Sequence, residues 1–452
     1  MLQRAETSHR RPRPSDRPRP RPGPWLALYS AALGLRVLCA WLATGPHGLP
    51  TSHAAEYDAV AWNLARGAGF SLAGAGDPYA TALVPPVVPW LTSLVYRAVG
   101  HQYFAGILLQ CAIGALVPLL LAGFAASIFG GRAGRIAGWL AALHPLLVFF
   151  SGRLLTETSF TALLLIALIA SAAWVKTPRG GRALGVGLTW GLASLARPAA
   201  LLLPAVVAAW AWVPLGLTVP GRERMRQMTL LLLGLALVVG PWTLRNALVL
   251  HAFVPITTAG GRALLDGNNE IVWNDPARRG GAIRAANVEP YASEARGRGE
   301  PEADALARRR AWAFLSARMS EWPAMAAAKL ARFWRVTAEG GWPRERSPLA
   351  RALSVIDPLL AWSVLTWPFA AWGLAQTLRG PRRFFQGLGF LVVLYFTALA
   401  VVFWGALSMR VPVEPMLVLF AAVGFEDTRR RLRMRTRALR VIPGRSGGAL
   451  AG

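Results

Sequence analysis

The sequence carries a small set of ionisable residues beside long apolar segments, where a charged side chain is costly to keep unless it has a use. These residues are Glu56, Asp58, Asp77, Arg153, Glu157, Arg197, Arg245, Arg410 and Glu414. A mixture of carboxylates and guanidiniums suits a transfer reaction in which a carboxylate activates an acceptor hydroxyl or amine while arginines hold a phosphate leaving group. The arginines would stabilise the negative charge that develops on the departing phosphate.

Several of these residues also have an ordinary structural interpretation. Glu56 and Asp58 open an expected helix, and the helix dipole favours acids there whatever the function. Thr156 and Glu157 stand at the start of an apolar run, where either residue can cap a helix. Arg410 can extend its guanidinium to a membrane interface. Whether these residues do chemistry therefore depends on the elements that bring them together.

Those elements are expected to be membrane spans. The chain has 452 residues, of which 54% are hydrophobic. The sequence predicts an all-α polytopic membrane protein with about ten transmembrane helices. The apolar runs of spanning length lie at about 25–44, 103–129, 134–151, 158–175, 182–196, 198–217, 228–247, 356–375, 384–404 and 409–425.

The basic residues orient these spans. The formal net charge is +27, and arginines crowd residues 1–24 and 426–452 and the short loops at 132–135, 176–182, 222–226 and 379–383. The remaining short connections carry one arginine each, at 153, 197 and 410. This pattern predicts two basic cytoplasmic tails, with the loops 45–102 and 248–355 on the opposite side. Membrane lipids are the expected partners of the charges, and nucleic acid is not.

Both long loops are expected to contain helices. Within residues 45–102, "YDAVAWNLARG" and "VVPWLTSLVYRAVG" are amphipathic and have the pattern of helices that lie along the membrane surface. Within residues 248–355, the segment 301–335 has helical periodicity. A connection as long as this second loop is uncommon without a function of its own.

No cofactor or metal is indicated. Cys39 and Cys111 lie in apolar runs without metal-ligand spacing, which favours packing. The segment "GAGFSLAGAG" lacks the Lys-Ser/Thr pair of a phosphate-binding loop, and the glycines of "TTAGGRALLDGNN" are interpreted as turns. His144 precedes Pro145 inside an apolar run and is expected to be a packed or hydrogen-bonded core residue.

Five segments, taken in order, resemble one family. They are "EYDAVAWNLARGAGFS" with "VPPVVPWLTSLVYRAVG", "SGRLLTETSF", "GLASLARPAALLLP", "GPWTLRNALVLHAFVPITTAGGRALLDGNN" and "MRVPVEPMLVLFAAVGF". The series resembles bacterial membrane glycosyltransferases of the GT-C class, in the group similar to dolichyl-phosphate-mannose-protein mannosyltransferases and aminoarabinose transferases. It covers most of residues 25–425. Its most specific piece is the Pro-Trp-x-x-Arg-Asn exit into the second loop.

The resemblance implies a GT-C domain over residues 25–425, in the inner membrane of a bacterium. It implies a polyprenyl-phosphate sugar donor, an acceptor that is a lipid, an envelope glycan or a protein, and transfer with inversion on the extracytoplasmic side. It implies no metal or other cofactor.

One departure from the family concerns the expected base. The family usually carries an acid four positions before the tyrosine of the first loop, and this sequence has His53 there. Glu56 or Asp58, or His53 itself, is left to accept the proton. By the same resemblance, Glu157 orients the acceptor or the donor sugar. The residues expected to bind the donor phosphate are Arg245, Arg197 and Arg410.

Two other functions stay open on the sequence. A non-catalytic scaffold of an envelope-polysaccharide complex is compatible with the histidine at position 53. A lipid or sugar transporter would favour charges at the membrane midplane and duplicated halves. The sequence contains no convincing internal repeat, and Arg36 is the main deep charge, without an evident partner.

Overall fold

The computed structural model describes residues 23–50, 53–72, 78–216, 218–337, 357–380 and 386–440. Most of the predicted N-terminal tail, residues 441–452 of the C-terminal tail, Asp77 and residues 338–356 of the second loop lie outside the described residues. The first part of the predicted C-terminal tail continues the last helix as far as Arg440.

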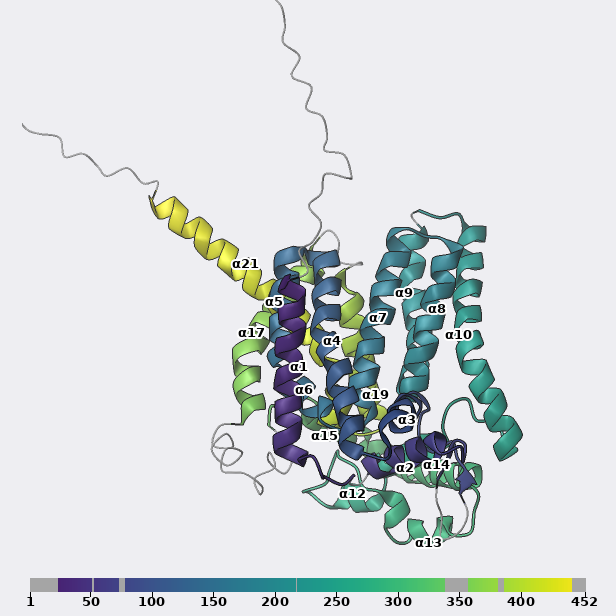
Figure 1. Ribbon diagram of the computed structural model, residues 1–452. Helices are drawn as coiled ribbons and strands as arrows, with labels where there is room; N and C mark the ends of the chain where they lie inside the picture. Colours follow the sequence, from purple (N-terminus) through teal and green to yellow (C-terminus); the bar gives the residue numbers. More distant parts are fainter. Residues whose placement is uncertain are drawn as a thin grey trace, which may run out of the picture.

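The described chain is a bundle of long helices capped at one end by short ones (Figure 1). Each predicted apolar run overlaps a helix of this bundle. The bundle helices are α1 (Gly23–Thr44), α4 (Tyr103–Phe129), α5 (Gly131–Leu143), α6 (Pro145–Ser151), α7 (Thr156–Lys176), α8 (Gly180–Ala196), η2 (Pro198–Ala200), α9 (Leu203–Gly216), α10 (Gly221–Leu250), α17 (Pro358–Arg379), α19 (Leu388–Val402) and α21 (Glu414–Arg440).

Among the described residues, six helical segments are long and apolar enough to cross a membrane, or seven if the bent pair α5–α6 counts as one span. Three predicted runs do not meet this criterion for a membrane span. Helices α8 and α19 are too short, with 17 and 15 residues, and the second half of α21 is rich in arginine. The protein is a multi-pass membrane protein.

The two ends of the bundle differ. The tail end is where α1 begins and α21 ends, and the loop end carries the elements of the two long loops (Figure 1). The loop elements are α2 (His53–Ala65), β1 (Ser71–Leu72), β2 (Tyr79–Ala80), α3 (Val87–Val99), α11 (Gly260–Gly267), α12 (Glu270–Asn274), η3 (Ala285–Asn287), α13 (Tyr291–Ala295), α14 (Glu300–Ala317), η4 (Met319–Glu321) and α15 (Trp322–Phe333). The short helix α20 (Leu407–Arg410) lies in the connection between α19 and α21.

The helices predicted in the loops are confirmed. The two amphipathic segments of the first loop form α2 and α3, and the periodic segment of the second loop forms α14 and α15. In Figure 1, α2 and α14 lie across the loop end of the bundle rather than along it.

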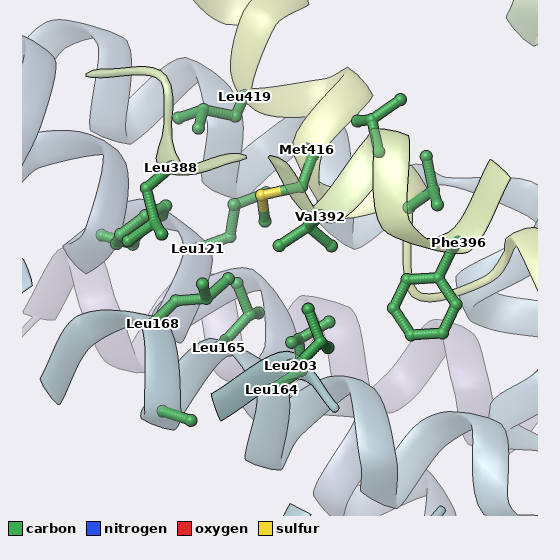
Figure 2. Packing of buried hydrophobic residues seen from close by; sticks show 14 of the residues in the cluster. Leu121, Leu164, Leu165, Leu168, Leu203, Leu388, Val392, Phe396, Met416 and Leu419 are labelled. Atoms are coloured by element: carbon green, nitrogen blue, oxygen red, sulfur yellow. The ribbon is translucent and has the colours of Figure 1, made fainter. Parts of the chain in front are cut away.

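The core is one large apolar cluster in which helices from both halves of the sequence meet. Figure 2 shows leucines of α7 facing α19 and α21, with Met416 among them. The labelled residues are Leu121, Leu164, Leu165, Leu168, Leu203, Leu388, Val392, Phe396, Met416 and Leu419. The last spans in the sequence are therefore packed against the early ones.

Glycines set the closest helix contacts. A Cβ on Gly187 of α8 would lie 2.0 Å from the Leu231 carbonyl oxygen of α10, and one on Gly234 would lie 2.3 Å from the Leu184 oxygen. Helices in membranes commonly approach each other at small residues in this way. The close packing of α8 against α10 therefore requires glycine at positions 187 and 234.

The span formed by α5 and α6 is bent by 55° at His144 and Pro145. Proline removes a backbone donor, so carbonyls near the end of α5 lose their helical partners. Arg36 of α1 supplies replacements, because its Nη1 donates to Ala142 O at 3.2 Å and its Nη2 to Ala141 O at 3.4 Å. The deep charge that lacked an evident partner in the sequence thus holds the bend.

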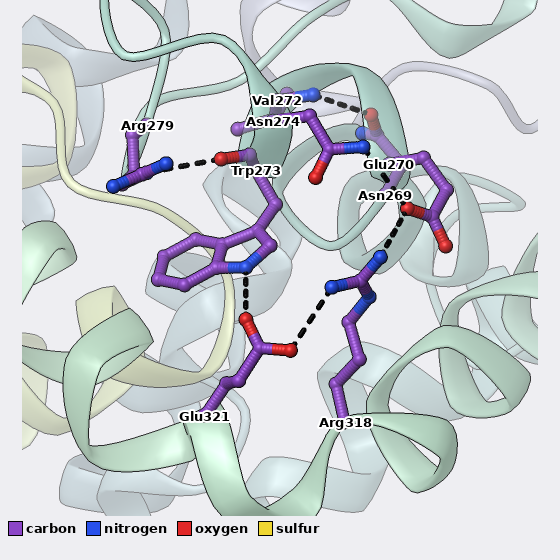
Figure 3. A network of polar contacts seen from close by, with 8 residues as sticks. All are labelled: Asn269, Glu270, Val272, Trp273, Asn274, Arg279, Arg318 and Glu321. Carbon is purple, nitrogen blue, oxygen red and sulfur yellow. Dashed lines mark hydrogen bonds and ion pairs between the residues drawn. The ribbon is translucent and has the colours of Figure 1, made fainter.

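The second loop is braced by a polar network (Figure 3). Arg318 lies between Glu270 and Glu321, at 2.7 Å and 2.9 Å. Trp273 donates its Nε1 hydrogen to Glu321, and Asn269 caps α12 by accepting from the Val272 backbone N–H. These contacts hold α12 against the junction of α14 and α15.

Candidate active site

Acids and arginines from both long loops meet at the loop end. Arg284 Nη2 lies 2.7 Å from Glu56 Oε1 and 2.8 Å from His53 Nδ1, which joins the second loop to the start of α2. Asp266 and Arg262 of α11 complete this group. The charge of Arg262 lowers the pKa of both Glu56 and Asp266, and His53 and Arg284 also lower the pKa of Asp266. We call His53, Glu56, Arg262, Asp266 and Arg284 the acid–arginine cluster.

Helix α11 is fixed where it can present Asp266. Its first turn donates backbone N–H groups of Gly261 and Arg262 to Asp304 Oδ1 of α14, at 2.6 Å and 3.2 Å. Gly261 is needed there, because a Cβ would lie 2.0 Å from the Asp304 carbonyl oxygen. The glycines interpreted as turns from the sequence instead open a helix packed closely on α14.

The two carboxylates of the cluster differ electrostatically. Burial raises the pKa of Asp266 to about 6, and the Ala285 N–H and the charges of Arg262, His53 and Arg284 only partly offset it. Burial acts in the same direction on Glu56, but His53 and Arg284 outweigh it and leave the pKa of Glu56 below its usual value. Asp266 is therefore the more basic of the two near neutral pH.

The contact with Arg284 constrains His53. A guanidinium has only donors, so Nδ1 of His53 must accept the hydrogen bond. His53 therefore orients Arg284 through its Nδ1 atom.

A second group lies beside α7. Glu157 and Arg197 form an ion pair, with 3.3 Å between Oε1 and Nη1, and both side chains are largely buried. Neither Glu157 Oε2 nor Arg197 Nη1 makes a hydrogen bond within the described part of the chain. Buried polar atoms without partners are rare in folded proteins and often mark a place where a ligand or water binds.

Tyr57 connects the two groups. It follows Glu56 in α2, and its phenol interacts with Thr156, Glu157 and Arg197. Burial, reinforced by the charge of Glu157, raises the pKa of Tyr57, so the phenol stays protonated. Adjacent residues of one helix thus reach the acid–arginine cluster and the Glu157–Arg197 pair.

Arg410 follows two residues that Arg197 contacts, and it is completely buried. Arg197 Nη2 reaches Ser408 O and Met409 Sδ, both at 3.5 Å. Arg410 Nε donates to Glu414 Oε1 at 2.6 Å, and Glu414 also contacts His144 Nε2 at 3.1 Å. Among the described residues, Arg410 Nη2 has no hydrogen-bond partner. The predicted core histidine is therefore part of a buried polar chain that ends at an arginine.

Asp58 lies apart from these groups. It is buried, with Oδ1 accepting from the Tyr96 hydroxyl at 2.5 Å and Oδ2 at 3.0 Å from His101 Nε2. His101 is in turn stacked on Trp62 of α2. Both carboxylate oxygens are thus used to hold α2 against α3, on the side of α2 that does not carry Glu56.

Arg245 is engaged with backbone. Its Nη1 donates to Thr81 O at 2.7 Å and its Nη2 to Phe70 O at 2.9 Å, which clamps the β1–β2 hairpin. The neighbouring Trp242 and Asn246 both donate to Ile256 O. The Pro-Trp-x-x-Arg-Asn segment is thus a joint between α10 and both loops, and the terminal nitrogens of Arg245 are already occupied.

Three members of the acid–arginine cluster were not predicted from the sequence: Arg262, Asp266 and Arg284. A signal for Asp266 was present, because an acid stands inside the segment "TTAGGRALLDGNN", which was singled out for its glycines. Arg284 lies in a stretch of mixed charge with no motif, and only its distance to Glu56 identifies it.

Comparison with known proteins agrees with this fold. Residues 83–243 match the family model described as dolichyl-phosphate-mannose-protein mannosyltransferase. Two structures of the Archaeoglobus fulgidus oligosaccharyltransferase, AglB with an inhibitory peptide and a dolichol-phosphate and the apo form, superpose with TM-scores of 0.55 and 0.56. Both are 14% identical and cover 94% of this chain, which itself spans 52% of theirs, about half their length.

Residues 83–243 thus resemble that family, and the chain has a fold similar to that of the oligosaccharyltransferase. Its predicted all-α GT-C fold is confirmed. A structure of ArnT from Cupriavidus metallidurans bound to undecaprenyl phosphate is also similar, with 16% identity, a TM-score of 0.46, and coverage of 94% of this chain and 81% of that one. No curated protein matches the sequence.

The part of the chain that matches the family model includes Glu157 and Arg197 but not the acid–arginine cluster. The residues that could act as a base thus come from outside the matched segment. A cavity of about 210 Å³ also opens at the loop end, lined by Ala277, Arg278, Gly281, Ala282, Arg332, Trp404, Gly405 and Ala406. Within the described residues, no three His, Cys, Asp or Glu side chains gather as a metal site.

Proposed function

We propose that the protein transfers a sugar from a polyprenyl-phosphate donor to a hydroxyl or amine of an acceptor at the extracytoplasmic face of the inner membrane. The acceptor is a lipid, an envelope glycan or a protein. Support comes from the family match and from acids and arginines that converge at the loop end, while arginine-rich segments occupy the tail end.

The donor phosphate is assigned to Arg197 and Arg410. Each has a buried terminal nitrogen without a hydrogen-bond partner among the described residues, and Arg197 contacts the residues just before Arg410. Guanidinium nitrogens form strong charge-assisted hydrogen bonds with phosphate oxygens. Glu157 Oε2, also unpartnered, is assigned to a sugar hydroxyl. Arg245 is left out of the phosphate site because it binds the hairpin.

Asp266 is assigned as the general base. Its Oδ1 accepts from the Ala285 N–H at 2.9 Å, which leaves Oδ2 for an acceptor proton. A pKa of about 6 keeps the carboxylate ionised at neutral pH while it remains a useful base. Glu56 is paired with Arg284 and serves to position that arginine; Asp58 is assigned a structural role.

The reaction is then a single displacement. The acceptor oxygen or nitrogen forms a bond to the anomeric carbon as the bond from that carbon to the phosphate oxygen breaks. The acceptor proton passes to Asp266, and the electron pair of the broken bond leaves on the polyprenyl phosphate. Attack from the face opposite the leaving group inverts the anomeric configuration.

The observation that carries this proposal is the meeting of Glu56 and Asp266, from separate loops, around Arg284, while the adjacent Tyr57 reaches the Glu157–Arg197 pair. Its test uses purified full-length protein in detergent, supplied with undecaprenyl-phosphate mannose or undecaprenyl-phosphate aminoarabinose and with lipid A or a peptide as acceptor. Release of undecaprenyl phosphate is measured by mass spectrometry. Asp266→Asn is expected to lower the rate roughly 10²- to 10⁴-fold, and Arg197→Gln roughly 10²- to 10³-fold.

Matched controls come from the same loop. Glu294 and Arg310 form a partly exposed ion pair on α13 and α14, so Glu294→Gln and Arg310→Gln remove the same charges without touching either group. Both controls are expected to retain the wild-type rate. If Asp266→Asn also retains it while Glu56→Gln does not, the base is Glu56; if neither matters, the assignment of the site is wrong.

The histidine at position 53 supports a second candidate, a protein that binds the donor without turning it over. His53 takes the place of the family's usual acid and is held by Arg284. This candidate predicts that the polyprenyl-phosphate donor raises the Tm of the protein, that Arg197→Gln abolishes this rise, and that no undecaprenyl phosphate is released.

A further inference from the structure

The tail end of the bundle has a pocket of its own. It has a volume of about 280 Å³ and lies between the start of α5 and the second half of α21. Its lining consists of four arginines and one isoleucine: Arg132, Arg135, Ile136, Arg429 and Arg433. The candidate active site lies at the opposite end of the helices (Figure 1).

The arginines of this pocket are not neutralised by its lining, which contains no acid. The neighbouring Asp427 is already bound, since it accepts from Arg431 at 2.7 Å and from Trp372 Nε1 at 3.0 Å. The first turn of α5 has no side-chain cap, so its backbone N–H groups add positive potential at the same place. Four like charges around one hollow repel each other unless an anion lies between them.

A general bias toward positive charge on one side of a membrane accounts for arginines in these loops. It does not account for their arrangement around one concavity. Each of the two helices contributes two arginines to the pocket. Arg132 and Arg135 are three residues apart on α5, and Arg429 and Arg433 are four residues apart on α21. Guanidiniums so placed match the oxygens of a phosphate, which they can bind through paired N–H groups.

The apolar surface below the pocket distinguishes a lipid from a free phosphate. Trp139 lies four residues after Arg135 in α5, and Phe425 lies four residues before Arg429 in α21. Residues four apart share a helix face, so Arg135 and Arg429 each have an aromatic neighbour one turn deeper in the membrane. Both rings are 45% exposed, as suits contact with acyl chains.

We propose that this pocket, the arginine pocket, binds the phosphate headgroup of an anionic phospholipid such as phosphatidylglycerol or cardiolipin. The headgroup phosphate sits between Arg132 and Arg135 of α5 and Arg429 and Arg433 of α21, and the acyl chains run along Trp139 and Phe425. The lipid thereby links the early and late halves of the chain. This site does not depend on the sugar-transfer proposal.

The experiment is native mass spectrometry of the full-length protein in detergent, titrated with phosphatidylglycerol, cardiolipin or phosphatidylcholine of matched chains. Wild-type protein is expected to retain the two anionic lipids preferentially. Arg132→Gln, Arg135→Gln, Arg429→Gln and Arg433→Gln are expected to weaken retention about fivefold each, and their combination at least about a hundredfold. The single variants keep the test valid if the combined variant does not fold.

A control variant removes four arginines from the same end of the bundle but outside the pocket: Arg179, Arg222, Arg430 and Arg435, each changed to Gln. It loses the same net charge and is expected to keep its lipids. Equal loss in both quadruple variants would mean that only the overall charge matters, and would overturn the proposal. A competition arm adds inorganic phosphate: if phosphate displaces the lipids at equal concentration, the pocket binds free phosphate rather than a lipid headgroup.

Discussion

At the scale of single residues, the structure assigns different environments to acids that look alike in the sequence. Glu56 and Asp58 are two positions apart in α2, yet one faces Arg284 and the other Tyr96 and His101. Neighbouring positions on a helix point to different sides, so only one of them can join a given site. Asp266, 208 residues or more away from both, has the environment that best suits a base.

The pH dependence of catalysis tests that assignment. With Asp266 as base, kcat/KM rises with pH through about 6, because only the ionised carboxylate accepts the proton. If Glu56 were the base, the rise would come below the usual range of a glutamate, since its pKa is lowered. Because Arg284 lowers the pKa of Asp266, Arg284→Gln is expected to move the rise to higher pH. An unmoved profile in that variant contradicts the assignment.

The residue roles could be predicted only in part. Glu157 and Arg197 each stand at a break between apolar runs, which is why the sequence identified them, and the structure pairs them. The contact of Arg284 with Glu56 could not be predicted, because it joins positions 228 residues apart through a loop without a motif. The hydrogen bonds of Arg245 could not be predicted either, because its acceptors are backbone carbonyls, which every residue has.

At the scale of elements, the apolar runs were a reliable guide because backbone in lipid must satisfy its own hydrogen bonds, so a long apolar run becomes a helix. What the runs do not encode is how helices pair. The α8–α10 contact rests on Gly187 and Gly234, and the α17–α21 contact rests on Gly373 and Gly424, whose added Cβ atoms would lie 1.9 Å and 2.0 Å from backbone oxygens. Glycine is common in membrane helices, so its spacing alone does not name the partner.

Two glycines of α8 provide a matched test of this pairing. Gly187→Ala places a Cβ against the Leu231 carbonyl, whereas a Cβ on Gly185 meets nothing within 4 Å. Gly187→Ala is therefore expected to lower the Tm of the detergent-solubilised protein, by an amount corresponding to about 1–3 kcal/mol of overpacking. Gly185→Ala is expected to leave it unchanged or raise it slightly. Equal effects in the two variants would show that close approach of α8 and α10 is not needed.

The contact between α2 and α3 is a second test at this scale. Asp58→Asn and Tyr96→Phe each remove one side of a buried hydrogen bond, and each is expected to destabilise the protein by about 1–3 kcal/mol. Because both act on one contact, the double variant is expected to be less destabilised than the sum of the singles. Thermal unfolding of the three variants measures this coupling. Strict additivity would mean that Asp58 does not act through Tyr96.

At the scale of the whole molecule, the two long loops form one cap. Glu300 of α14 accepts from the Thr81 hydroxyl at 2.5 Å, from the Ala82 N–H at 3.0 Å and from the Thr258 hydroxyl at 2.8 Å. Together with Arg284, it fastens the first loop to the second, while Arg245 fastens the first loop to α10. The candidate active site is built where these connections meet.

Removing that fastening is expected to loosen the cap and leave the bundle intact. Glu300→Gln weakens three hydrogen bonds, so backbone amides near Thr81 and Ala82 should exchange with deuterium faster, while those of α4 and α7 remain protected. Glu302→Gln, on the same first turn of α14, is the control and should leave the exchange of the first loop unchanged. If both variants behave like wild type, the loops are held by other contacts.

The bond between Glu300 and Thr81 also has a consequence for how the protein is made. The two residues are 219 positions apart, so a ribosome has to synthesise several spans after Thr81 before Glu300 exists. During that time the β1–β2 hairpin lacks the carboxylate that holds it. Nascent chains that end before Glu300 should therefore remain open to protease in the first loop, and resistance should arise only once α14 has been synthesised.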